Sequence, residues 1–468
     1  MPLILGTNSI KDTGYDVANS CRFNVADNAK LSRSISGSPT DPDKFTISFW
    51  MKKTALSNQV VFGNYANANF RSELSFSSDD RLQYFQRNDG SATFDVVLSR
   101  QFRDPNAWFH IVFVYDTGQG TDTNRFKFFV NGVHDTNYSH NSPFPAQDLD
   151  GRLNQASQTL VIGQDGNDAK DFNGYLAEVV LIDGQALDAD QFGEFDSASG
   201  IWKPIDVSGL TFGDDGFYLD FEDSGDLGDE ESGLAATDQS IDTCTNNFAT
   251  WNSLQPTNAT LTEGNLVGAS SASSGHYSGI SSIGVSSGKW YFECKQTQES
   301  TANEGMIGVI IFDGSNTLTA LLNPVGRGGG WGMQDGTRGF STDSGGSGST
   351  TDNFHAGWTD DDIIGIALDI DNSRVYFSKN GQWNNSGSWD ASSPTTSQTL
   401  QNGLGDGTYF FMAGDASGSN NNTWSANFGS PAFAISSGNT DGEGLGNFEF
   451  AVPSGYFALC TKNLAEYG

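Results

Sequence analysis

The carboxylates that come nearest to a catalytic pair are Glu194 and Asp196, which flank Phe195 in one short stretch. Hydrolysis of a glycosidic bond needs two such groups facing each other across the substrate, one as acid and the other as nucleophile or base. Ser199 stands three residues after Asp196, so the stretch lacks a further glutamate. We therefore interpret Glu194 and Asp196 as solvated surface acids.

The histidines also fail to form a catalytic motif. None lies in a Gly-x-Ser-x-Gly or His-Glu-x-x-His context; they are His110, His134, His140, His276 and His355. His110 stands in a predicted strand, where we expect it to pack. The run GGGWG at 328–332 is followed by neither Lys-Ser/Thr nor a helix signal, so it does not predict a phosphate-binding loop. The sequence therefore predicts a protein that is not an enzyme.

Oxygen-rich runs leave Ca²⁺ as the one candidate cofactor. Asp165, Asn167 and Asp168 fall in the run DGND, and residues 360–362 are all Asp. Such hard oxygen donors suit Ca²⁺, but neither run ends in the closing glutamate of a known calcium loop. The four cysteines lie far apart with no CxxC pair, which predicts buried thiols and no zinc site. The sequence therefore predicts no obligatory cofactor, with Ca²⁺ at 165–168 as a hypothesis.

Aromatic side chains in polar loops are the candidates for ligand binding, because sugars stack on exposed aromatic rings. These candidates are Trp331, Trp358, Trp383 and Trp389 in the second half and Tyr65 and Phe70 in the first. The alternative for each ring is that it plugs the end of a folded layer. One hypothesis makes Trp383 and Trp389 a binding rim, so that alanine at both positions weakens binding and leaves thermal stability almost unchanged.

The charge balance excludes nucleic acid as a partner. Against 57 acidic residues the chain has 24 Lys and Arg, a net charge of −33, whereas phosphate binding needs an excess of Lys and Arg. A charge of this size keeps a protein soluble and suits a saline environment. No window resembles a membrane span, and the N-terminus does not resemble a signal peptide. We therefore expect synthesis in the cytoplasm and no membrane insertion.

Short strands must position these residues. Residues 45–51 alternate in the manner of a strand with one buried face, and Asn131-Gly132 predicts a tight hairpin turn. A short helix is expected at 188–192, with Asp188 capping its first turn. Further strands are expected at 111–115, 125–130, 160–163, 176–182, 288–293, 306–312, 363–370, 374–377, 409–413 and 424–428.

An acidic stretch from 214 to 231, followed by Ser, Thr and Asn, separates the two halves. The sequence therefore predicts a domain at 1–215, a connection at 216–265 and a second domain at 266–468. Leu219 and Phe221 alternate with acids, so part of the connection would also suit an edge strand of the first domain. With 56 Gly, 34 Phe and only 17% charged residues, the expected fold class is all-β, with two antiparallel, jelly-roll-like β-sandwiches in tandem.

Three segments of the first half carry a family resemblance. They are LSR (31–33) with FTISFWMKK (45–53), WFHIVFVY (108–115) with FVNGV (129–133), and FNGYLAEVVLID (172–183) followed by Ala186-Leu187. Together they resemble the laminin G-like, concanavalin A-like jelly-roll family, in the variant common in phage virion proteins. Retaining glucanases of this fold carry Glu-x-Asp-x-x-Glu on one strand, a pattern that Ser199 interrupts here.

The second half carries a different resemblance. Its motifs GKWYFE (288–293), IGV (307–309), DIIGIALD (362–369), VYFSKNG (375–381) and NFG (427–429) resemble the SPRY domain, a β-sandwich used as a binding module. The segments YLDFEDSGDLG (218–228), TNNF (245–248), PSGY (453–456) and CTKNL (460–464) resemble the linker and tail that join these two modules in phage tail and capsid-fibre proteins.

The resemblance implies a virion surface protein, either a tail fibre, a capsid fibre or a decoration protein, that attaches to host-surface glycan or protein. One alternative is an architectural cement or adaptor that binds only other virion proteins. Another is a glycan depolymerase, which the incomplete carboxylate set disfavours. Fibre proteins are commonly trimers, so a homotrimer is expected, although the chain has no heptads or triple β-helix repeats.

Overall fold

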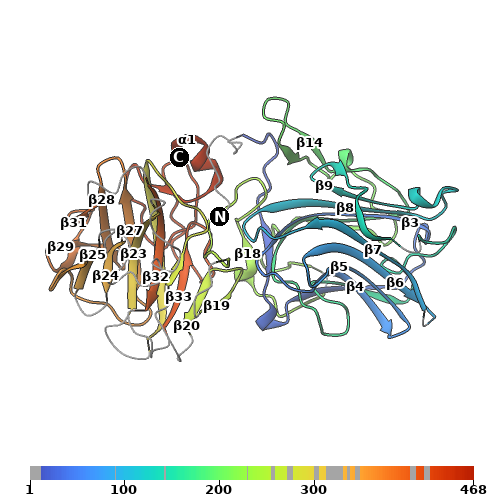
Figure 1. The fold of residues 1–468 in the computed structure, drawn as a ribbon, viewed down its shortest axis with the longest axis horizontal. Coiled ribbons are helices and arrows are strands. Elements are labelled where there is room, and N and C mark those ends of the chain that lie inside the picture. Colours follow the sequence, from blue (N-terminus) through green and yellow to red (C-terminus); the bar gives the residue numbers. More distant parts are fainter. Residues whose placement is uncertain are drawn as a thin grey trace. The chain divides into compact units, whose positions relative to one another are not determined.

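The computed structural model of the chain describes residues 12–89, 91–141, 144–228, 230–254, 259–270, 278–299, 305–312, 330–334, 338–342, 348–400, 407–415 and 422–468. They divide into two compact units, one over residues 12–247 and the other over residues 248–468. Nearly all regular structure in both units is strand (Figure 1). The predicted all-β class with tandem β-sandwiches is confirmed.

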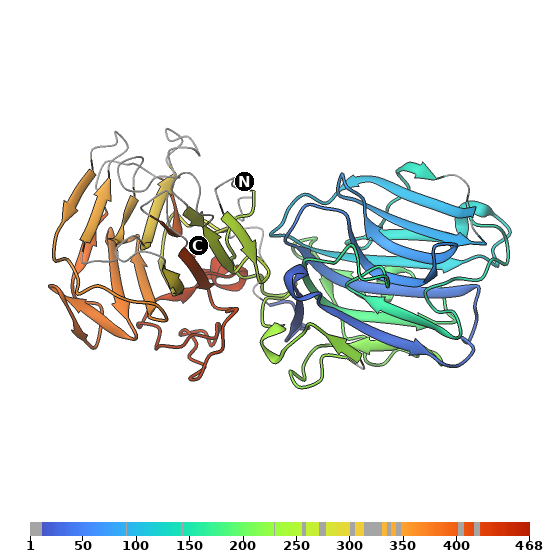
Figure 2. The ribbon, with the colours of Figure 1, turned by 90° about the horizontal axis from the view of Figure 1, so that it is seen from below.

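The first unit consists of two facing sheets of antiparallel strands, which Figure 1 shows as two layers and Figure 2 shows from below. One sheet has the order β10-β9-β8-β3-β13-β1-β18, with β16 beside β13. Its strands are β1 (Ser20–Phe23), β3 (Lys44–Lys53), β8 (Trp108–Asp116), β9 (Phe126–Val130), β10 (Val133–His134), β13 (Gly174–Asp183), β16 (Phe217–Leu219) and β18 (Gln239–Ser240).

The facing sheet has the order β11-β7-β6-β5-β4-β12-β2-β17. Its strands are β2 (Lys30–Ile35), β4 (Gln59–Asn67), β5 (Phe70–Phe76), β6 (Arg81–Asn88), β7 (Ser91–Gln101), β11 (Tyr138–Asn141), β12 (Gln158–Ile162) and β17 (Glu230–Ser232). A small hairpin of β14 (Gly193–Phe195) and β15 (Trp202–Pro204) and the short 3-10 helices η2 (Val25–Asp27), η3 (Asp122–Asn124), η4 (Ala189–Gln191) and η5 (Ala236–Asp238) complete the unit.

The hairpin between β9 and β10 forms as predicted. Asn131 and Gly132 have φ angles of 46° and 76°, the positive values that a two-residue turn of this kind requires. The strands expected at 111–115, 160–163 and 176–182 correspond to β8, β12 and β13.

Strand β3 is buried on both faces, whereas its period predicts one buried face. Phe45, Ile47 and Phe49 point into the core between the sheets, while Thr46 and Trp50 are buried on the other side. The reason is that the chain following β13 folds back over the outside of this sheet. There it covers hydrophobic side chains of β8 and β13 with Ala189, Phe192 and Val207. Alternation in a strand cannot reveal such a covering segment.

The helix predicted at 188–192 is a single turn, η4 (Ala189–Gln191). Asp188 precedes it but makes no capping hydrogen bond with its side chain. Its carboxylate instead accepts a hydrogen bond from Lys127 Nζ at 2.8 Å. The ion pair therefore replaces the predicted cap.

The predicted connection at 216–265 is wrong as a boundary, because most of it belongs to the first unit. Within it, β16 pairs with β13, β17 with β2 and β18 with β1. Farther along, the Asp242 carboxylate accepts a hydrogen bond from the fully buried Lys52 Nζ at 2.7 Å, and Asn247 Oδ1 accepts another from the same ammonium at 2.7 Å. These contacts hold the chain to the first sandwich as far as Asn247.

The second unit consists of two further sheets. One has the order β19-β20-β33-β22-β27-β28-β29-β30, with β31 beside β28 and β34 beside β22, and the other has the order β21-β32-β23-β24-β25-β26. Their strands are β19 (Ala259–Thr262), β20 (Val267–Ser270), β21 (Ser278–Ile280), β22 (Lys289–Glu299), β23 (Gly305–Phe312), β24 (Gly330–Gln334), β25 (Arg338–Thr342), β26 (Gly348–Thr351), β27 (Ile363–Asp369), β28 (Arg374–Lys379), β29 (Gln382–Asn385), β30 (Ser388–Ala391), β31 (Ser397–Thr399), β32 (Thr408–Asp415), β33 (Asn422–Asn427) and β34 (Phe457–Ala458). Helix α1 (Thr461–Tyr467) follows β34.

A buried carboxylate fixes the C-terminal loop of the second unit to its sheet. Glu293 of β22 has no exposed surface and accepts hydrogen bonds from the backbone N–H groups of Glu449 and Phe450, each at 2.9 Å. The hydroxyl of Tyr291 and the amide of Asn427 donate to the same carboxylate, at 3.0 and 3.2 Å. Burial raises the pKa of Glu293 to about 7.

The two hydrophobic cores are rich in aromatic rings. The first packs phenylalanines of both sheets against each other, and the second is built around the fully buried Trp251, Trp290, Trp331 and Trp424. Burying side chains of this size contributes about 1.5–3 kcal/mol each. All four cysteines remain thiols, and three of them are buried, in agreement with the prediction.

Candidate ligand-binding site

Three of the four predicted tryptophans lie in the core of the second unit, which corrects the prediction that they present a binding surface. Trp331 is fully buried, and Trp358 and Trp383 are each 4% exposed. The Trp358 ring stacks on His355 with centroids 5.1 Å apart, and its Nε1 donates to Gln296 Oε1 at 2.6 Å. A ring with so little exposed surface has no face to offer a sugar. These three rings therefore stabilise the sandwich.

The predicted rim of Trp383 and Trp389 is wrong for its first member. Trp383 packs with its ring centroid 6.4 Å from that of Tyr291, and removing it would leave a cavity. Trp389 is half-buried, and its Nε1 donates to the carbonyl of Gly357 at 2.9 Å. Of this pair, Trp389 alone keeps exposed ring surface.

Tyr65 and Phe70 are both half-buried, but they lie on opposite faces of their sheet. Tyr65 pairs with Arg71 across β4 and β5, and side chains directly opposite each other share a face. Phe70 precedes Arg71 on β5 and so points the other way, where the Arg152 guanidinium lies 4.8 Å from the centre of its ring. Phe70 therefore belongs to the packing at the end of the sandwich.

The predicted calcium ligands are engaged in other contacts. Asp165 Oδ1 accepts hydrogen bonds from the backbone N–H groups of Asn167 and Ala169, at 2.7 and 3.2 Å. Asp168 forms an ion pair with Lys30 at 2.5 Å, and the Asn167 side chain is exposed. Among the described residues, no group of three or more His, Cys, Asp and Glu side chains is arranged to hold a metal ion. The three predicted ligands close a loop and do not converge.

A cluster of charged and aromatic side chains lies on the outer face of the sheet that contains β4 to β7. Cross-strand pairing of Arg71 with Arg87, Glu73 with Phe85 and Phe85 with Asp95 places these residues on one face, because paired residues point the same way. Leu82 and Tyr84 of β6 point into the core instead. We call this cluster the Arg71–Phe85 face; it consists of Tyr65, Arg71, Glu73, Phe85, Arg87, Asp95 and Lys170.

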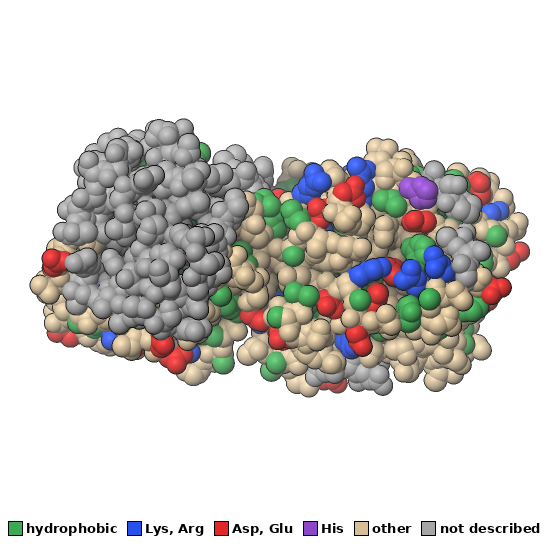
Figure 3. All heavy atoms as spheres, turned by 60° about the horizontal axis from the view of Figure 1, so that its bottom comes forward, with side chains coloured by type: hydrophobic (Ala, Val, Ile, Leu, Met, Phe, Trp, Pro, Cys, Tyr) green, Lys and Arg blue, Asp and Glu red, His purple; other side chains and the backbone are tan. Residues whose placement is uncertain are grey.

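The half-buried ring of Phe85 is the centre of this face. The guanidinium carbons of Arg71 and Arg87 lie 5.2 and 5.5 Å from the centre of the ring, within the range of a cation–π contact. Figure 3 looks onto the underside of the first unit as drawn in Figure 1, where Lys and Arg side chains gather beside hydrophobic and acidic ones. The face therefore combines a half-buried aromatic ring with several hydrogen-bond donors.

Glu73 holds the cations of the face in position. It is 2% exposed, and its carboxylate lies 2.5 Å from Lys170 Nζ and 3.4 Å from Arg71 Nη1. Asp95 pairs with Phe85 across β6 and β7. Burial raises the pKa of its carboxyl group, while the charge of His140 lowers it and the charge of Glu73 raises it by smaller amounts. In formal charge, the three cations Arg71, Arg87 and Lys170 thus exceed the two carboxylates Glu73 and Asp95. The local charge is positive on a chain with a net charge of −33.

The loop that carries the predicted calcium ligands borders this face. At Gly63 of β4 a Cβ atom would lie 2.3 Å from the carbonyl oxygen of Gln164, so only glycine allows the loop to lie there. At Gly166 a Cβ atom would lie 3.3 Å from the Cβ of Tyr65. Lys170 extends from the same loop to Glu73. The fold therefore brings the 165–168 loop beside Tyr65, at the border of the Arg71–Phe85 face.

The central residues of this face were not predicted from the sequence. The signal is present in β6, where Leu82 and Tyr84 alternate with Arg81, Gln83, Phe85 and Arg87. The solvent-facing side of an antiparallel strand is ordinarily polar, whereas here an aromatic ring stands among the polar residues. Recognising the pattern requires knowing that β5 lies beside β6, because Arg71 and Glu73 supply the other half.

The two carboxylates considered for catalysis lie on the β14–β15 hairpin with structural partners. Glu194 pairs with Lys203 at 3.1 Å, and Asp196 Oδ1 accepts hydrogen bonds from the N–H and hydroxyl of Ser199, both at 2.7 Å. His110 is 1% exposed, lies 2.9 Å from Ser48 Oγ and accepts a hydrogen bond from Trp202 Nε1 at 3.0 Å. Burial lowers the pKa of His110 to about 3. His110 thus has the predicted packing role.

Residues 26–191 match the family model described as "Concanavalin A-like lectin/glucanases superfamily". The first sandwich is therefore a concanavalin A-like, laminin G-like domain. A fold of this lectin type suggests that the protein binds carbohydrate or another protein. The concanavalin A-like domain also contains the whole Arg71–Phe85 face. No curated protein matches the chain.

Several solved structures are similar to parts of the chain. A pentraxin from Limulus polyphemus has 16% identity over 38% of this chain and 81% of its own, with a TM-score of 0.29. The SPRY domain of human HERC1 has 15% identity over 38% of this chain and 96% of its own, also with a TM-score of 0.29. Domains LG4-5 of the mouse laminin α1 chain have 11% identity over 96% of this chain and 89% of theirs, with a TM-score of 0.29.

Within the ranges that the structure describes, no helix is long and apolar enough to cross a membrane.

Proposed function

We propose that this chain is a non-enzymatic adhesion protein of the bacteriophage virion surface, acting as a tail fibre, capsid fibre or decoration protein. In this proposal the concanavalin A-like domain binds a host-surface glycan through the Arg71–Phe85 face. The virion assignment is supported by the segments at 218–228, 245–248 and 453–464, which resemble the linker and tail of phage fibre proteins. The SPRY-like motifs of the second half support a second binding module, directed at protein.

The observation that carries the proposal is the arrangement around Phe85. A sugar ring can pack its apolar C–H surface on an aromatic ring while its hydroxyl groups accept hydrogen bonds from flanking cations. Arg71 and Arg87 flank the ring, and Glu73 holds Arg71 and Lys170 in place before any ligand arrives. Preorganised donors of this kind lower the entropy lost on binding.

The role assigned to the carboxylates supports binding without turnover. Glu194 and Asp196 are each held by neighbours on one hairpin, and Glu73 is the buried anchor of two cations. A glycosidase would need two carboxyl groups that face a bound sugar from opposite sides. The protein is therefore expected to bind a polysaccharide and to leave it intact.

The experiment that tests this function measures binding of the purified protein to a panel of neutral and acidic glycans and to host cells. Arg87→Met removes the charge and donors but keeps an unbranched side chain, so it should weaken glycan binding by about tenfold or more, the loss expected for a hydrogen bond to a charged group. Arg100→Met is the matched control, because Arg100 lies on β7, pairs with Asp135 at 3.1 Å and is outside the face.

Unchanged glycan affinity in Arg87→Met would contradict the assignment of this face. If the protein binds other virion proteins but no host cell and no glycan, it is an architectural cement or adaptor instead. Chain shortening of a polysaccharide by the purified protein would contradict the non-enzymatic assignment.

A further inference from the structure

A lysine, an aspartate and an asparagine meet inside the first unit. Lys52 Nζ, at the end of β3, donates to Asp242 Oδ2 and to Asn247 Oδ1, each at 2.7 Å. Lys52 has no exposed surface, and Asp242 and Asn247 are 1% and 8% exposed. An amine, a carboxylate and an amide carbonyl are thus held together where solvent is largely excluded.

The surrounding hydrogen bonds fix the orientation of the Asn247 amide. Its Nδ2 donates to the backbone carbonyl of Asn106 at 2.7 Å, so Oδ1 is the atom that faces Lys52. Because an amide C=O bond is about 1.23 Å long, Lys52 Nζ lies within about 4 Å of the Asn247 Cγ. Reaction within a molecule is strongly favoured when the reacting atoms are held about 3–3.5 Å apart. Only a small shift therefore separates Nζ from attack on Cγ.

Asp242 is placed to take a proton from Lys52. Trp108 Nε1 donates to Asp242 Oδ1 at 3.1 Å, while Oδ2 faces the ammonium. Burial lowers the pKa of Lys52, and the charges of Asp242 and Asp104 oppose this change with smaller effects. The neutral amine is the nucleophilic form of lysine. Burial and a neighbouring proton acceptor therefore both favour the reactive form.

Aromatic rings close the site. Lys52 Nζ lies 5.4 Å from the centre of the fully buried Tyr175 ring, and the Trp108 ring packs with its centroid 6.3 Å from that of Tyr175. In such surroundings water competes little with the amine for the carbonyl carbon. The packing thus favours transfer of the acyl group to lysine over its hydrolysis.

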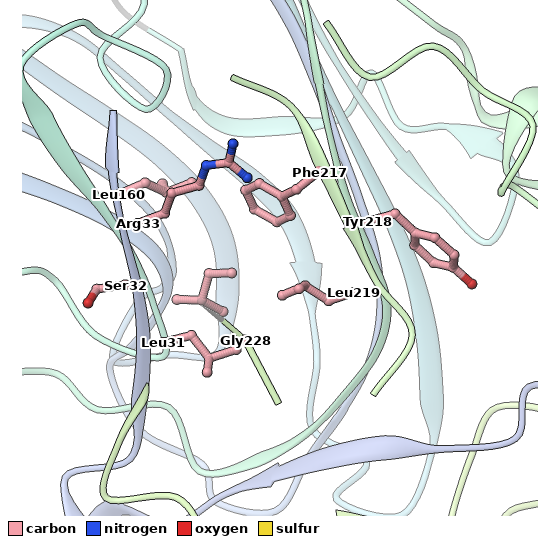
Figure 4. Close-up of a pocket in the computed structure, with 9 residues that line it drawn as sticks. Leu31, Ser32, Arg33, Leu160, Phe217, Tyr218, Leu219 and Gly228 are labelled. Atoms are coloured by element: carbon pink, nitrogen blue, oxygen red, sulfur yellow. The ribbon is translucent and has the colours of Figure 1, made fainter. Parts of the chain in front are cut away.

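A pocket elsewhere in the first unit lacks this combination of groups. It has a volume of about 150 Å³ and lies between β2, β12 and β16, where Figure 4 shows Leu31, Phe217 and Leu219 pointing towards a common space. The described residues that line it include no Asp, Glu, Asn, Gln or Lys. The groups for an acyl transfer meet at Lys52 instead.

We propose that Lys52 and Asn247 join spontaneously in an intramolecular isopeptide bond, with Asp242 as the proton acceptor. The lone pair of Lys52 Nζ forms the bond to the Asn247 Cγ, and the bond between Cγ and Nδ2 breaks. Of the three protons of the ammonium, one passes to Asp242, one leaves with Nδ2 as ammonia, and one remains on the new amide. No oxidant, reductant or cofactor is needed. The ion pair in the structure is the reactant state.

The product is more favourable in this environment than the ion pair. Taking an ammonium and a carboxylate out of water carries a desolvation cost that often exceeds their attraction. After the reaction Lys52 is part of a neutral amide, and Asp242 is a neutral acid that can donate a hydrogen bond to the new amide oxygen. Ammonia departs into the solvent, so the bond does not reverse.

The bond joins β3 to the last residue of the first unit. Lys52 and Asn247 lie 195 positions apart, and Asn247 ends the unit. All strands between these two residues then belong to one covalent loop, which restricts the unfolded chain. The site shares no residue with the Arg71–Phe85 face, so the bond is a property of the fold and does not depend on the proposed glycan binding.

Mass spectrometry of the denatured full chain tests the proposal directly. The original protein should be lighter than its sequence by one ammonia, and proteolysis should yield two peptides joined through Lys52 and Asn247. Asn247→Ala should have the full mass of its own sequence. Lys53 is the internal control, because it is also buried and lies 3.0 Å from the carboxylate of Asp80. It should remain an unmodified amine.

Two variants test the proton acceptor and the effect of the bond. Asp242→Asn should slow bond formation by about a hundredfold or more, the usual contribution of a general base, so that freshly made protein keeps its full mass. Asn247→Ala loses the covalent loop, and its melting temperature should fall by about 10 °C or more. Asn167→Ala changes an exposed side chain and is the control, which should keep both the bond and the melting temperature.

The proposal is overturned if the original chain has its full sequence mass with Lys52 and Asn247 in separate peptides. It is also overturned if Lys52 is joined to Asp242 with loss of water. Both results come from the original chain, so they do not depend on the folding of any variant. Glycan binding does not enter this test, so its failure and the failure of the proposed function are distinguishable.

Discussion

Glu178 has an environment that its position in the sequence does not suggest. It lies in the middle of β13, where the pairing with β3 shifts between Ala177 and Val180, and its φ angle is 49°. Its side chain is 6% exposed and accepts hydrogen bonds from the hydroxyls of Tyr218 and Tyr15, at 2.9 and 3.2 Å. The irregularity in the strand thus directs a carboxyl group towards two tyrosines that fix β16 and residues 12–18 to the sheet.

This environment predicts a specific pH dependence of stability. Burial raises the pKa of Glu178 from its ordinary value of 4.5 to about 7. Because the folded state binds the Glu178 proton more tightly than the unfolded state does, protonation of Glu178 stabilises the fold. This stabilisation is complete below about pH 4.5 and is lost as the pH rises to about 7. Glu178→Gln stays neutral, so its melting temperature relative to the original protein should rise across this interval and level off above it.

The measurement is a series of thermal unfolding curves between pH 4 and 8. Glu194→Gln is the control, since Glu194 is exposed on the surface and its removal should not change the slope. Glu293 has a similarly raised pKa in the second unit, but it contributes equally to both proteins and cancels in the comparison. A constant difference between Glu178→Gln and the original protein at all pH values would contradict the assignment.

For single residues, the sequence indicated which side chains could bind a ligand or pack, but not what surrounds them in the folded protein. The sequence correctly predicted that His110 packs inside the fold, because apolar neighbours in a strand predict burial. It could not distinguish Trp389 from Trp383, because both have polar neighbours in the sequence and only the folding of β29 and β30 decides which ring is covered. The Arg71–Phe85 face escaped prediction because its parts come from separate strands.

At the scale of elements, hydrophobic period and turn residues predicted the long strands and the Asn131-Gly132 hairpin well. The alternation at Leu219 also indicated the edge strand that β16 forms beside β13. The same criteria failed for β17 and β18, which are three and two residues long. Such strands carry too few residues for a period to appear, and their pairing partners are distant in the chain. Their place in the first sandwich follows from tertiary contacts such as that between Lys52 and Asp242.

Because of these contacts, truncated chains can test at which residue the first domain ends. A chain of residues 1–247 should unfold cooperatively, whereas one of residues 1–215 should not, because it lacks three strands and leaves Lys52 buried without its carboxylate partner. Breaking a buried ion pair by removing one partner costs about 3–5 kcal/mol. In the full chain, Asp242→Asn should therefore lower the stability of this unit without removing any strand.

Circular dichroism melts and limited proteolysis would measure the outcome. Equal cooperativity of the two truncated chains would show that residues 216–247 are a connection after all, as their composition suggests. If Asp242→Asn were as stable as the original protein, the hydrogen bond from Lys52 to Asn247 would be sufficient to stabilise the buried Lys52 ammonium.

For the whole molecule, composition predicted the all-β class and the charge predicted how the protein should respond to salt. The chain has a net charge of −33. Its excess acidic side chains repel one another more strongly in the folded state than in the expanded unfolded chain. Added salt screens this repulsion over a Debye length that falls from about 30 Å at 0.01 M to about 10 Å at 0.1 M. The melting temperature should therefore rise as NaCl increases through this range.

A comparison of Ca²⁺ with Mg²⁺ tests whether charge screening accounts for the whole rise in melting temperature. The predicted calcium ligands Asp165 and Asp168 are occupied by backbone and lysine partners, so equal concentrations of Mg²⁺ and Ca²⁺ should raise the melting temperature by equal amounts. A specific site would favour Ca²⁺, because Mg²⁺ demands stricter geometry and dehydrates reluctantly. Extra stabilisation by Ca²⁺ that disappears in Asp165→Asn, but persists in the surface variant Asp190→Asn, would restore the 165–168 loop as a calcium site and contradict the assignment made here.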